Sequence, residues 1–391
     1  MRFIDWLDER LEIRKLIKVS LTDYKVPKNI NFLWSFGMLL VLTFAILFIS
    51  GLFLLMYYKP DAKLAFDSVN KTIIMDVSYG WLFRHVHAVA ASIVFLLMFI
   101  HIGRGIYYGS YKSPREIVWI TGYILFILFA ATAFTGYLLP WGQMSYWAAQ
   151  TITTLFEKIP FIGPQLVIWL RGDYAVSDPT LTRFFALHVT LLPVLIMIVM
   201  GIHLYSVRIV GSNNEDGKPI DKKKEGVPFW PVFMSKEFFV MSVFLLFFFY
   251  LVFFKFDFAM DRVNFEPANP LQTPTHIYPE WYFLAFYEVL RGFFFSQNLG
   301  LIAFALSMVM ILFLPWLDKS PTVSGKNRPL FQIAFWIFVI DVLVLTILGK
   351  LPPTGLYAWV GFFAALVFFG FFISLPIIAR IEKKQLEGDK K

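Results

Sequence analysis

The sequence predicts an all-α integral membrane protein with eight transmembrane helices, and three observations support this fold class. The 391 residues are 58% hydrophobic and 16% charged, against about 45–50% and about 25% in soluble domains. The charges fall in blocks between long apolar runs. Eight of these runs reach the roughly 20 residues that a helix needs to cross a bilayer.

The predicted helices divide into a first and a second group of four. Residues 1–31 precede them, mix acids with bases, and lack the apolar core and cleavage site of a secretory signal, so we expect a cytoplasmic surface helix there. Residues 32–210 contain the first four spans as one bundle, and residues 211–391 contain the other four. The spans are predicted at residues 32–57, 80–103, 117–139, 182–207, 237–256, 296–317, 329–349 and 356–379.

Loop charges predict the orientation. With eight spans both termini lie on one side, and 24 of the 35 Lys and Arg residues fall there, so the positive-inside rule places the termini in the cytoplasm of a bacterial cell. This distribution also accounts for the net charge of +8, and nucleic acid is not an expected partner. On the outer side, residues 141–172 and 262–292 are too long and aromatic for turns. We expect amphipathic helices at the interface in both.

Four of the six histidines lie inside predicted spans, and the chain has no cysteine. Cysteine-ligated clusters and covalent haem attachment are therefore excluded. His87 and His101 share the second span, and His188 and His203 share the fourth. Separations of 14 and 15 residues correspond to roughly 21 and 22 Å of helix rise.

These spacings predict two histidine pairs, one above the other. The second and fourth spans run in the same direction, so His87 lies at the depth of His188. His101 likewise lies at the depth of His203. A lone membrane histidine is more often a hydrogen-bonding partner between helices, but four at matched depths favour two stacked, non-covalent b-type haems with bis-histidine ligation. His85, about 200° around the helix from His87, is predicted to point elsewhere.

Glycines repeat at the same interval. Gly37 and Gly51 on the first span are 14 residues apart, as are Gly122 and Gly136 on the third. A flat macrocycle between helices needs positions without side chains, so we interpret these glycines as part of two haem slots. The alternative is ordinary small-residue packing between membrane helices.

Arginines at the ends of these spans are candidates for binding haem propionates. Arg84, Arg104 and Arg183 each lie within five residues of a candidate ligand, where charge-assisted hydrogen bonds to carboxylates are favourable. Interfacial snorkelling of the arginines explains the same spacing equally well.

Several motifs together resemble cytochrome b of bacterial and mitochondrial bc complexes. The resemblance covers residues from about 30 to 380 and is carried by GWLFRHVHAVAAS, LPWGQMSYW, GSNN, TPTHIYPEWYFLAFYEVLR and RPLFQIAFWIFVIDVLVLT. Both halves of the family occur in one chain, unlike the split photosynthetic relatives. Two features depart from the mitochondrial pattern: the 15-residue spacing of His188 and His203, and Arg208 where many members have a quinone-contacting histidine.

The resemblance implies a quinol:cytochrome c oxidoreductase subunit with a quinol-oxidation site outside and a quinone-reduction site inside. His87 and His188 would hold an outer, low-potential haem. His101 and His203 would hold an inner, high-potential haem. The implied partners are a Rieske iron–sulfur protein, a c-type cytochrome, the membrane quinone pool, lipid and a second copy of the complex.

The resemblance also assigns residues to the quinone sites. Glu280 of PEWY would accept a proton from quinol, although an acid at this place can also cap a helix or pair with an arginine. The other outer-site candidates are Tyr137, Tyr282, Tyr287, Met144 and Phe134. The candidates for inner-site or cofactor binding are Trp34, Trp119, Ser212, Lys236, Glu237 and Arg208. His276 and Asp341 are interpreted as structural, the latter as a hydrogen-bonding residue between helices.

Two other classes of protein fit the sequence less well. A di-haem membrane anchor of a quinone-linked dehydrogenase accounts for the first four spans but has no counterpart of PEWY. A secondary transporter would show paired internal repeats, and the two halves of this chain differ in their histidines and glycines.

Overall fold

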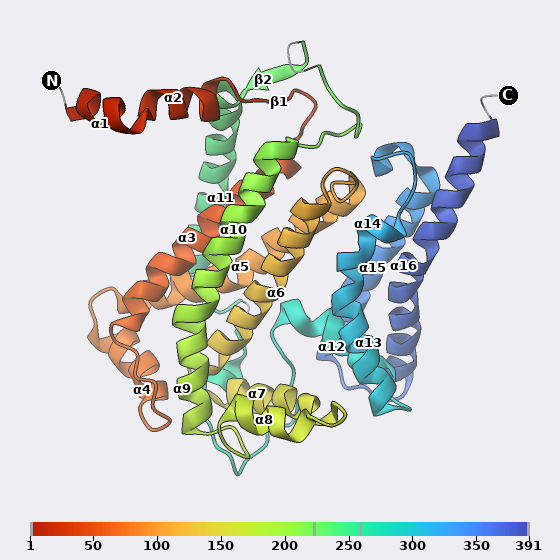
Figure 1. Ribbon diagram of the computed structural model, residues 1–391. Coiled ribbons are helices and arrows are strands. Elements are labelled where there is room, and N and C mark those ends of the chain that lie inside the picture. The colour runs from red at the N-terminus through yellow and green to blue at the C-terminus, as the bar shows by residue number, and fades with distance from the viewer. Residues whose placement is uncertain (1–2, 222–223, 259, 389–391) are drawn as a thin grey trace.

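Eight helices of the computed structural model are long and apolar enough to cross a membrane, within the residues that it describes, 3–221, 224–258 and 260–388 (Figure 1). The number of predicted spans is thereby confirmed. Residues 1, 2 and 389–391 of the predicted terminal segments lie outside the described residues. The eight helical spans are Phe32–Leu55, Gly80–Tyr107, Glu116–Leu138, Asp178–Val210, Phe229–Phe254, Gln297–Leu317, Pro329–Lys350 and Leu356–Gly388.

The helices differ from the predicted spans mainly at their ends. The second helix continues to Tyr107, the fifth begins at Phe229, and the last reaches Gly388. Hydropathy detects the apolar length that matches the bilayer core. Helical hydrogen bonding has no such requirement, and a helix can continue through charged residues into the polar interface.

The elements follow in chain order, with η marking short 3-10 or π-helical segments. The first half contains α1 (Phe3–Leu11), α2 (Ile13–Ile17), η1 (Lys18–Thr22), β1 (Lys25–Pro27), η2 (Phe32–Ser35), α3 (Phe36–Leu55), α4 (Ala65–Asp67), η3 (Ser68–Asp76), α5 (Gly80–Tyr107), α6 (Glu116–Leu138), α7 (Gln143–Leu155), η4 (Phe156–Lys158), α8 (Gly163–Arg171), α9 (Asp178–Ala186), η5 (Leu187–Leu191) and α10 (Leu192–Val210). The second half contains β2 (Gly226–Pro228), η6 (Phe229–Phe233), α11 (Met234–Phe254), η7 (Arg262–Phe265), η8 (Trp281–Phe283), α12 (Leu284–Gly292), α13 (Gln297–Met310), η9 (Ile311–Phe313), α14 (Leu314–Leu317), η10 (Gly325–Asn327), α15 (Pro329–Lys350) and α16 (Leu356–Gly388).

The helices form two neighbouring groups (Figure 1). In the first, α3 packs on α5 and α6 packs on α10, with α11 against α5. In the second, α12 packs on α13, α15 and α16. Both ends of the chain lie at the top of Figure 1, and α7 and α8 lie across the bottom. The interfacial helices predicted between the third and fourth spans are therefore found.

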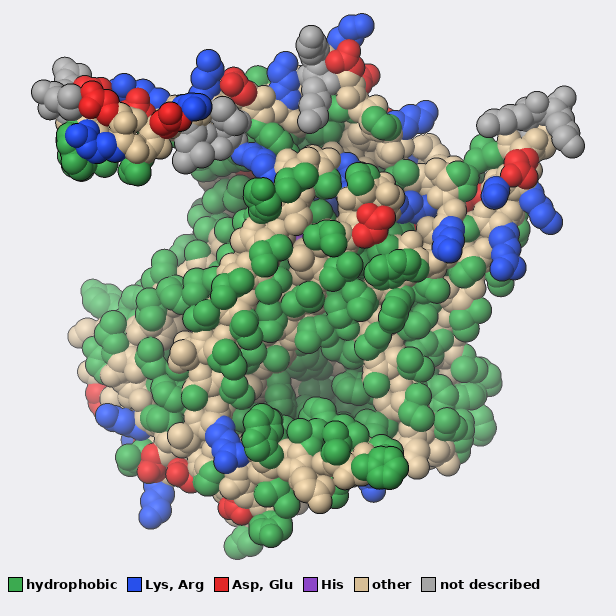
Figure 2. All heavy atoms as spheres, in the orientation of Figure 1, with side chains coloured by type: hydrophobic (Ala, Val, Ile, Leu, Met, Phe, Trp, Pro, Cys, Tyr) green, Lys and Arg blue, Asp and Glu red, His purple; other side chains and the backbone are tan. Residues whose placement is uncertain are grey.

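The N-terminal segment crosses the same end of the bundle as the two termini. Helices α1 and α2 extend to one side in Figure 1, and β1 pairs antiparallel with β2, Val26 opposite Val227. This short ladder joins the N-terminal segment to the start of the fifth span. A broad belt of hydrophobic side chains covers the face in Figure 2, with Lys, Arg, Asp and Glu gathered at its two ends, as expected for a chain that spans a bilayer.

The fourth span is not a regular α-helix. Between α9 and α10 it passes through the π-helical turn η5, where the N–H of Leu192 donates to the carbonyl of Leu187, five residues back. An α-helix would use the residue four back. Pro193, which has no N–H to donate, follows directly. The turn therefore takes up about one additional residue between His188 and His203.

A buried ion cluster joins distant segments at the end of the bundle that carries the termini. Arg328 donates to both carboxylate oxygens of Asp318, at 2.7 and 2.9 Å, and its Nε lies 3.0 Å from Glu382 of α16. Lys112, between α5 and α6, lies 3.1 Å from Asp318, and Tyr111 also donates to Asp318. Each side chain in this cluster has partners, as buried charges require.

Candidate functional site

His87 of α5 and His188 of η5 face each other across the first of two cavities inside the first helix group. The centres of their imidazole rings are 6.3 Å apart, and the ring planes are inclined by 76°. Two metal–nitrogen bonds of about 2.0 Å each, together with roughly 1 Å from each nitrogen to its ring centre, span about 6 Å. The two rings are therefore spaced to hold one iron between them.

His101 of α5 and His203 of α10 line the second cavity, nearer the end that carries the termini. The two cavities have volumes of about 280 and about 300 Å³. The predicted arrangement of two histidine pairs at two depths of one bundle agrees with these positions.

Hydroxyl groups engage Nδ1 of one histidine in each pair. Ser50 Oγ lies 3.0 Å from Nδ1 of His87, and Thr121 Oγ1 lies 3.0 Å from Nδ1 of His203. Both hydroxyls donate their own hydrogen to backbone carbonyls of their helix. They are therefore placed to accept a hydrogen bond from the ring, which leaves Nε2 for a metal.

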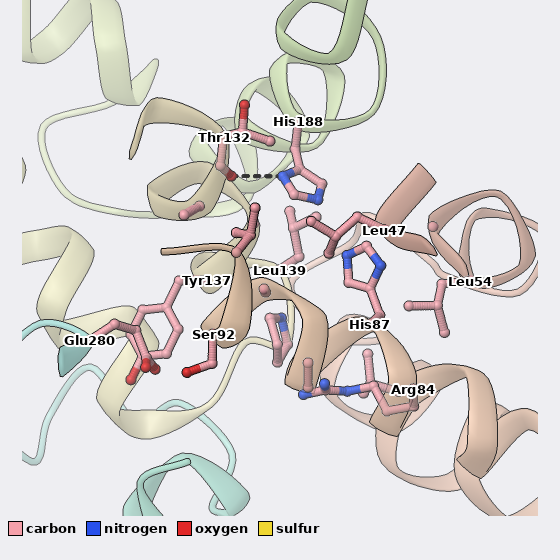
Figure 3. A pocket seen from close by; sticks show the side chains of 18 of the residues that line it. Leu47, Leu54, Arg84, His87, Ser92, Thr132, Tyr137, Leu139, His188 and Glu280 are labelled. Carbon is pink, nitrogen blue, oxygen red and sulfur yellow. Dashed lines mark hydrogen bonds between the residues drawn. The ribbon is translucent and has the colours of Figure 1, made fainter. Parts of the chain in front are cut away.

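The other two histidines also have neighbours at Nδ1. His188 Nδ1 lies 2.8 Å from the carbonyl oxygen of Thr132, as the dashed line in Figure 3 shows. Arg104 Nη2 lies 3.3 Å from Nδ1 of His101. Arginine can only donate, so His101 is the one ligand candidate whose Nδ1 faces a cation rather than an acceptor.

Each of the four repeating glycines faces one of the four histidines. A Cβ atom added at any of them would meet Cε1 of an imidazole ring. The sequence suggested that these glycines make room for a macrocycle, and the structure shows that their missing side chains make room for the ligand rings themselves. The distances are 3.3 Å from Gly37 to His101, 3.3 Å from Gly51 to His87, 3.1 Å from Gly122 to His203 and 2.3 Å from Gly136 to His188.

The π-helical turn explains how unequal spacings match. Gly122 and Gly136 are 14 residues apart on a continuous α-helix, whereas the facing His203 and His188 are 15 apart. In a regular helix the extra residue would rotate one ring by about 100°. Because η5 absorbs that residue, both rings face α6.

The three arginines proposed for propionates differ in position. Arg84 lines the first cavity and Arg104 the second. The Nε of Arg104 is buried and has no hydrogen-bond partner, which fits a carboxylate of a bound cofactor. Arg183 lines neither cavity; it is exposed and donates to the carbonyl of Trp169. The structure therefore does not support Arg183 as a cofactor contact, because this hydrogen bond directs its side chain toward α8.

Glu280 reaches the first cavity from the segment before η8. Figure 3 shows its carboxylate beside the hydroxyl of Tyr137, with Arg84 nearby. Tyr282 lines the same cavity and stacks on Phe95 at 3.9 Å between ring centres. An acid, a phenol and a cation thus lie at the edge of the cavity that holds the first histidine pair.

The environment of Glu280 favours its protonated form. Burial raises its pKa from 4.5 to about 7, Asp261 also raises it, and a hydrogen bond from Tyr137 and the charge of Arg84 act in the opposite direction. A carboxyl group with a pKa near neutral can both accept and release a proton at physiological pH. This property is suited to proton transfer.

Three candidates for the outer site do not line this cavity. Met144 is buried in α7, and Phe134 packs edge-on against Phe184. The hydroxyl of Tyr287 donates to the carbonyl of Ile277 at 3.2 Å. The sequence motifs placed these residues in the right region, but their side chains are engaged elsewhere in the structure.

The inner-site candidates fall into two sets. Lys236 is exposed and does not line the second cavity, and the guanidinium of Arg208 lies 3.8 Å above the ring of Tyr24. The cavity also contains Glu237, whose carboxylate accepts a 2.7 Å hydrogen bond from Ser35. The candidates that line the second cavity are Trp34, Trp119, Ser212 and Glu237.

The histidines and the acid interpreted as structural lie away from both cavities. His85 stacks on Phe256 at 3.8 Å, so it points away from His87 as predicted. His276 is exposed, and the described residues contain no group of three or more His, Cys, Asp or Glu placed to hold a metal ion. Asp341 is buried, but its Oδ2 has no hydrogen-bond partner. Its expected hydrogen bond between helices is therefore not formed by this atom, because the surrounding core is apolar.

Sequence reasoning missed several residues of the site. Ser50 and Thr121 each directly precede a repeating glycine, and that dipeptide pattern was an available signal. Asp261, which lines the first cavity and accepts a hydrogen bond from Tyr278, lies in a loop where nothing in the sequence distinguishes it. Its position depends on the folding of the whole loop.

Comparisons with known proteins agree with this geometry. The family model described as Cytochrome b/b6/petB matches residues 21–211, and that described as Cytochrome b(C-terminal)/b6/petD matches residues 267–369. A cytochrome b of Rickettsia bellii is 45% identical over 97% of this chain and 94% of its own length. A cytochrome b/c1 of Bradyrhizobium diazoefficiens is 43% identical over 97% of this chain and 55% of its own length. A chain of a solved hyperthermophilic respiratory Complex III superposes with a TM-score of 0.93 at 44% identity, over 97% of this chain and 99% of that chain.

Proposed function

The chain belongs to the cytochrome b family, and we propose that it is the di-haem membrane subunit of a quinol:cytochrome c oxidoreductase. The observation that carries this proposal is the correspondence of four histidines with four glycines at two depths of one helix bundle. The C-terminal family match also supports it over a dehydrogenase anchor, which would account for the first four spans alone.

His87 and His188 would hold the outer haem, and His101 and His203 the inner haem. Bound haem iron supplies reversible one-electron transfer, and two haems at different depths make an electron path across the bilayer. The protein fixes the rings from behind. Glycines admit the imidazoles at close range, and hydrogen bonds at Nδ1 hold each ring with Nε2 toward the cavity.

Quinol oxidation would take place beside the first cavity. Quinol releases two electrons and two protons, so its site needs a proton acceptor and a route to water. Glu280 is the acceptor, since its carboxylate reaches the cavity edge and its pKa is near neutral. The Tyr137 hydroxyl donates to this carboxylate and orients it, and Asp261, which lines the same cavity, is a second acid for passing the proton outward.

The two electrons of quinol would take separate paths. The chain has no cysteine, so an iron–sulfur acceptor must belong to another protein, and we assign this role to a Rieske protein followed by a c-type cytochrome. The names of two relatives, a cytochrome b/c1 and a respiratory Complex III, support such partners. The second electron would cross to the inner histidine pair.

The inner cavity would receive quinone near the cytoplasm. Trp34, Ser212 and Glu237 line it, and they supply an aromatic ring, a hydroxyl and a buried acid for a quinone and its protons. Proton release outside and uptake inside would contribute to the membrane potential. The distribution of Lys and Arg supports a bacterial plasma membrane location with both termini in the cytoplasm.

A reduced-minus-oxidised spectrum with a redox titration of the purified complex tests this function. We expect two b-type haems with separate midpoint potentials. Substitution of His203 by Leu should remove the inner haem while leaving the outer one bound. One haem in the unsubstituted protein, or loss of both haems in the His203 variant, would contradict the assignment of two independent histidine pairs.

A further inference from the structure

Two arginines approach the second cavity from different helices. Arg104 lies in the last turn of α5, and Arg115 directly precedes α6. Both line the cavity that holds His101 and His203. The resemblance and the motifs assigned a role to Arg104, and they assigned none to Arg115.

Both guanidinium groups have an unsatisfied donor there. The Nε atoms of Arg104 and Arg115 are two of the four buried side-chain N or O atoms without a hydrogen-bond partner among the described residues. Neither arginine forms a salt bridge within that part of the chain, and the charge interactions that favour their charged forms come from tyrosines, Tyr108 and Tyr24. Burial lowers the pKa of Arg115, which reflects this lack of compensating negative charge.

The acid that lines the same cavity is already engaged. Glu237 accepts a hydrogen bond from Ser35 at 2.7 Å, and it forms no ion pair with either arginine within the described residues. A buried cation without a counter-charge costs several kcal/mol. Two such cations aimed into one cavity therefore indicate an anionic group that binds there.

We infer that Arg115, together with Arg104, binds the carboxylates of the haem held by His101 and His203. This inference rests on the proposed haem-binding function and extends it to a residue outside the helix that supplies the ligand. Arginine presents a planar set of donors that matches a carboxylate, so two arginines fit two carboxylates. Ser110, whose hydroxyl lies 3.3 Å from Arg104 Nη1, adds a polar group between them.

Arg115 should also influence the inner haem electrostatically. A nearby positive charge favours the reduced form of the iron, because that form carries one positive charge less. At roughly 10 Å and an effective dielectric constant of about 20, one unit charge changes the reduced-to-oxidised ratio by about tenfold or somewhat more. For a one-electron couple, tenfold corresponds to about 59 mV.

The test is a redox titration of the whole complex carrying Arg115→Gln, with Arg115→Lys and Arg380→Gln as companions. Arg380 is an exposed arginine near the end of α16 and serves as the charge-matched control. We expect Arg115→Gln to lower the reduced-to-oxidised ratio of the inner haem about tenfold at a fixed potential, with the outer haem unchanged. Arg115→Lys should restore most of this loss, and Arg380→Gln should have no effect.

A double variant separates shared binding from independent effects. If Arg104 and Arg115 hold the same cofactor, the shift in Arg104→Gln/Arg115→Gln should differ from the sum of the two single shifts. Two bound haems with an unchanged inner titration in Arg115→Gln would overturn the inference. Slower quinone reduction or loss of bound phospholipid with that unchanged titration would also overturn it and identify a quinone oxyanion or a lipid phosphate as the ligand. Absence of two haems in the unsubstituted complex would instead refute the proposed function.

Discussion

Substitution of Gly136 by alanine should selectively damage the outer haem site. The added Cβ would lie 2.3 Å from Cε1 and 2.7 Å from Nδ1 of His188. Ordinary contacts between such atoms begin near 3.4 Å, so the ring or the helix must move by about 1 Å. Overpacking of this kind typically costs about 1–3 kcal/mol, which corresponds to a roughly five- to 150-fold loss of haem affinity.

The glycine series provides graded controls for this prediction. Gly51→Ala meets His87 at 3.3 Å, so a small shift of the ring accommodates it, and Gly370→Ala on α16 meets nothing within 4 Å. The assay is the outer-haem content per protein, from reduced-minus-oxidised spectra resolved by redox titration. The expected order of loss is Gly136, then Gly51, then Gly370. Equal outer-haem content in the Gly136 and Gly370 variants would refute the reasoning.

Three further predictions follow from the same geometry. In the unsubstituted complex, quinol oxidation should rise with pH through about 7, because Glu280 accepts a proton only when ionised and its pKa is raised to about 7; Glu280→Gln should slow steady-state turnover at least tenfold and flatten this profile with both haems retained, and undiminished turnover would exclude Glu280 from proton transfer. Thr121→Val removes the hydroxyl 3.0 Å from Nδ1 of His203, which should make the ligand less basic and raise the midpoint potential of the inner haem alone, with an unchanged potential counting against the hydrogen bond. Arg328→Leu leaves two buried carboxylates without their cation and should destabilise the protein by about 3–5 kcal/mol, seen as a lower thermal unfolding midpoint in detergent, whereas the exposed Lys384→Leu should leave that midpoint unchanged.

Hydropathy and spacing predicted the membrane fold and the ligand histidines because both depend on short-range regularities. Eight apolar runs became eight helices, and a 14-residue period on one helix puts two side chains on one face whatever the rest of the chain does. His188 was identified for the same reason, although its 15-residue spacing fits only because of a π-helical turn that hydropathy could not reveal.

The quinone-site residues were less predictable because their side chains depend on long-range packing. Motif position brought Glu280 and Tyr137 to one cavity, yet it also suggested Met144 and Tyr287, which the structure engages elsewhere. Arg115 shows the opposite failure. It looked like an ordinary loop charge in the sequence, and its significance appears only when the cavity behind it and its unpaired Nε are seen together.

The buried ion cluster has a consequence for how the chain is made. Arg328 precedes the seventh span and Asp318 follows the sixth, but their second carboxylate partner, Glu382, lies ten residues from the C-terminus. During synthesis the first six spans can enter the bilayer while this partner is still inside the ribosome. The end of the bundle near the inner cavity therefore cannot be completed until translation finishes, and a chain truncated before Glu382 would insert all eight helices yet leave that end unlocked.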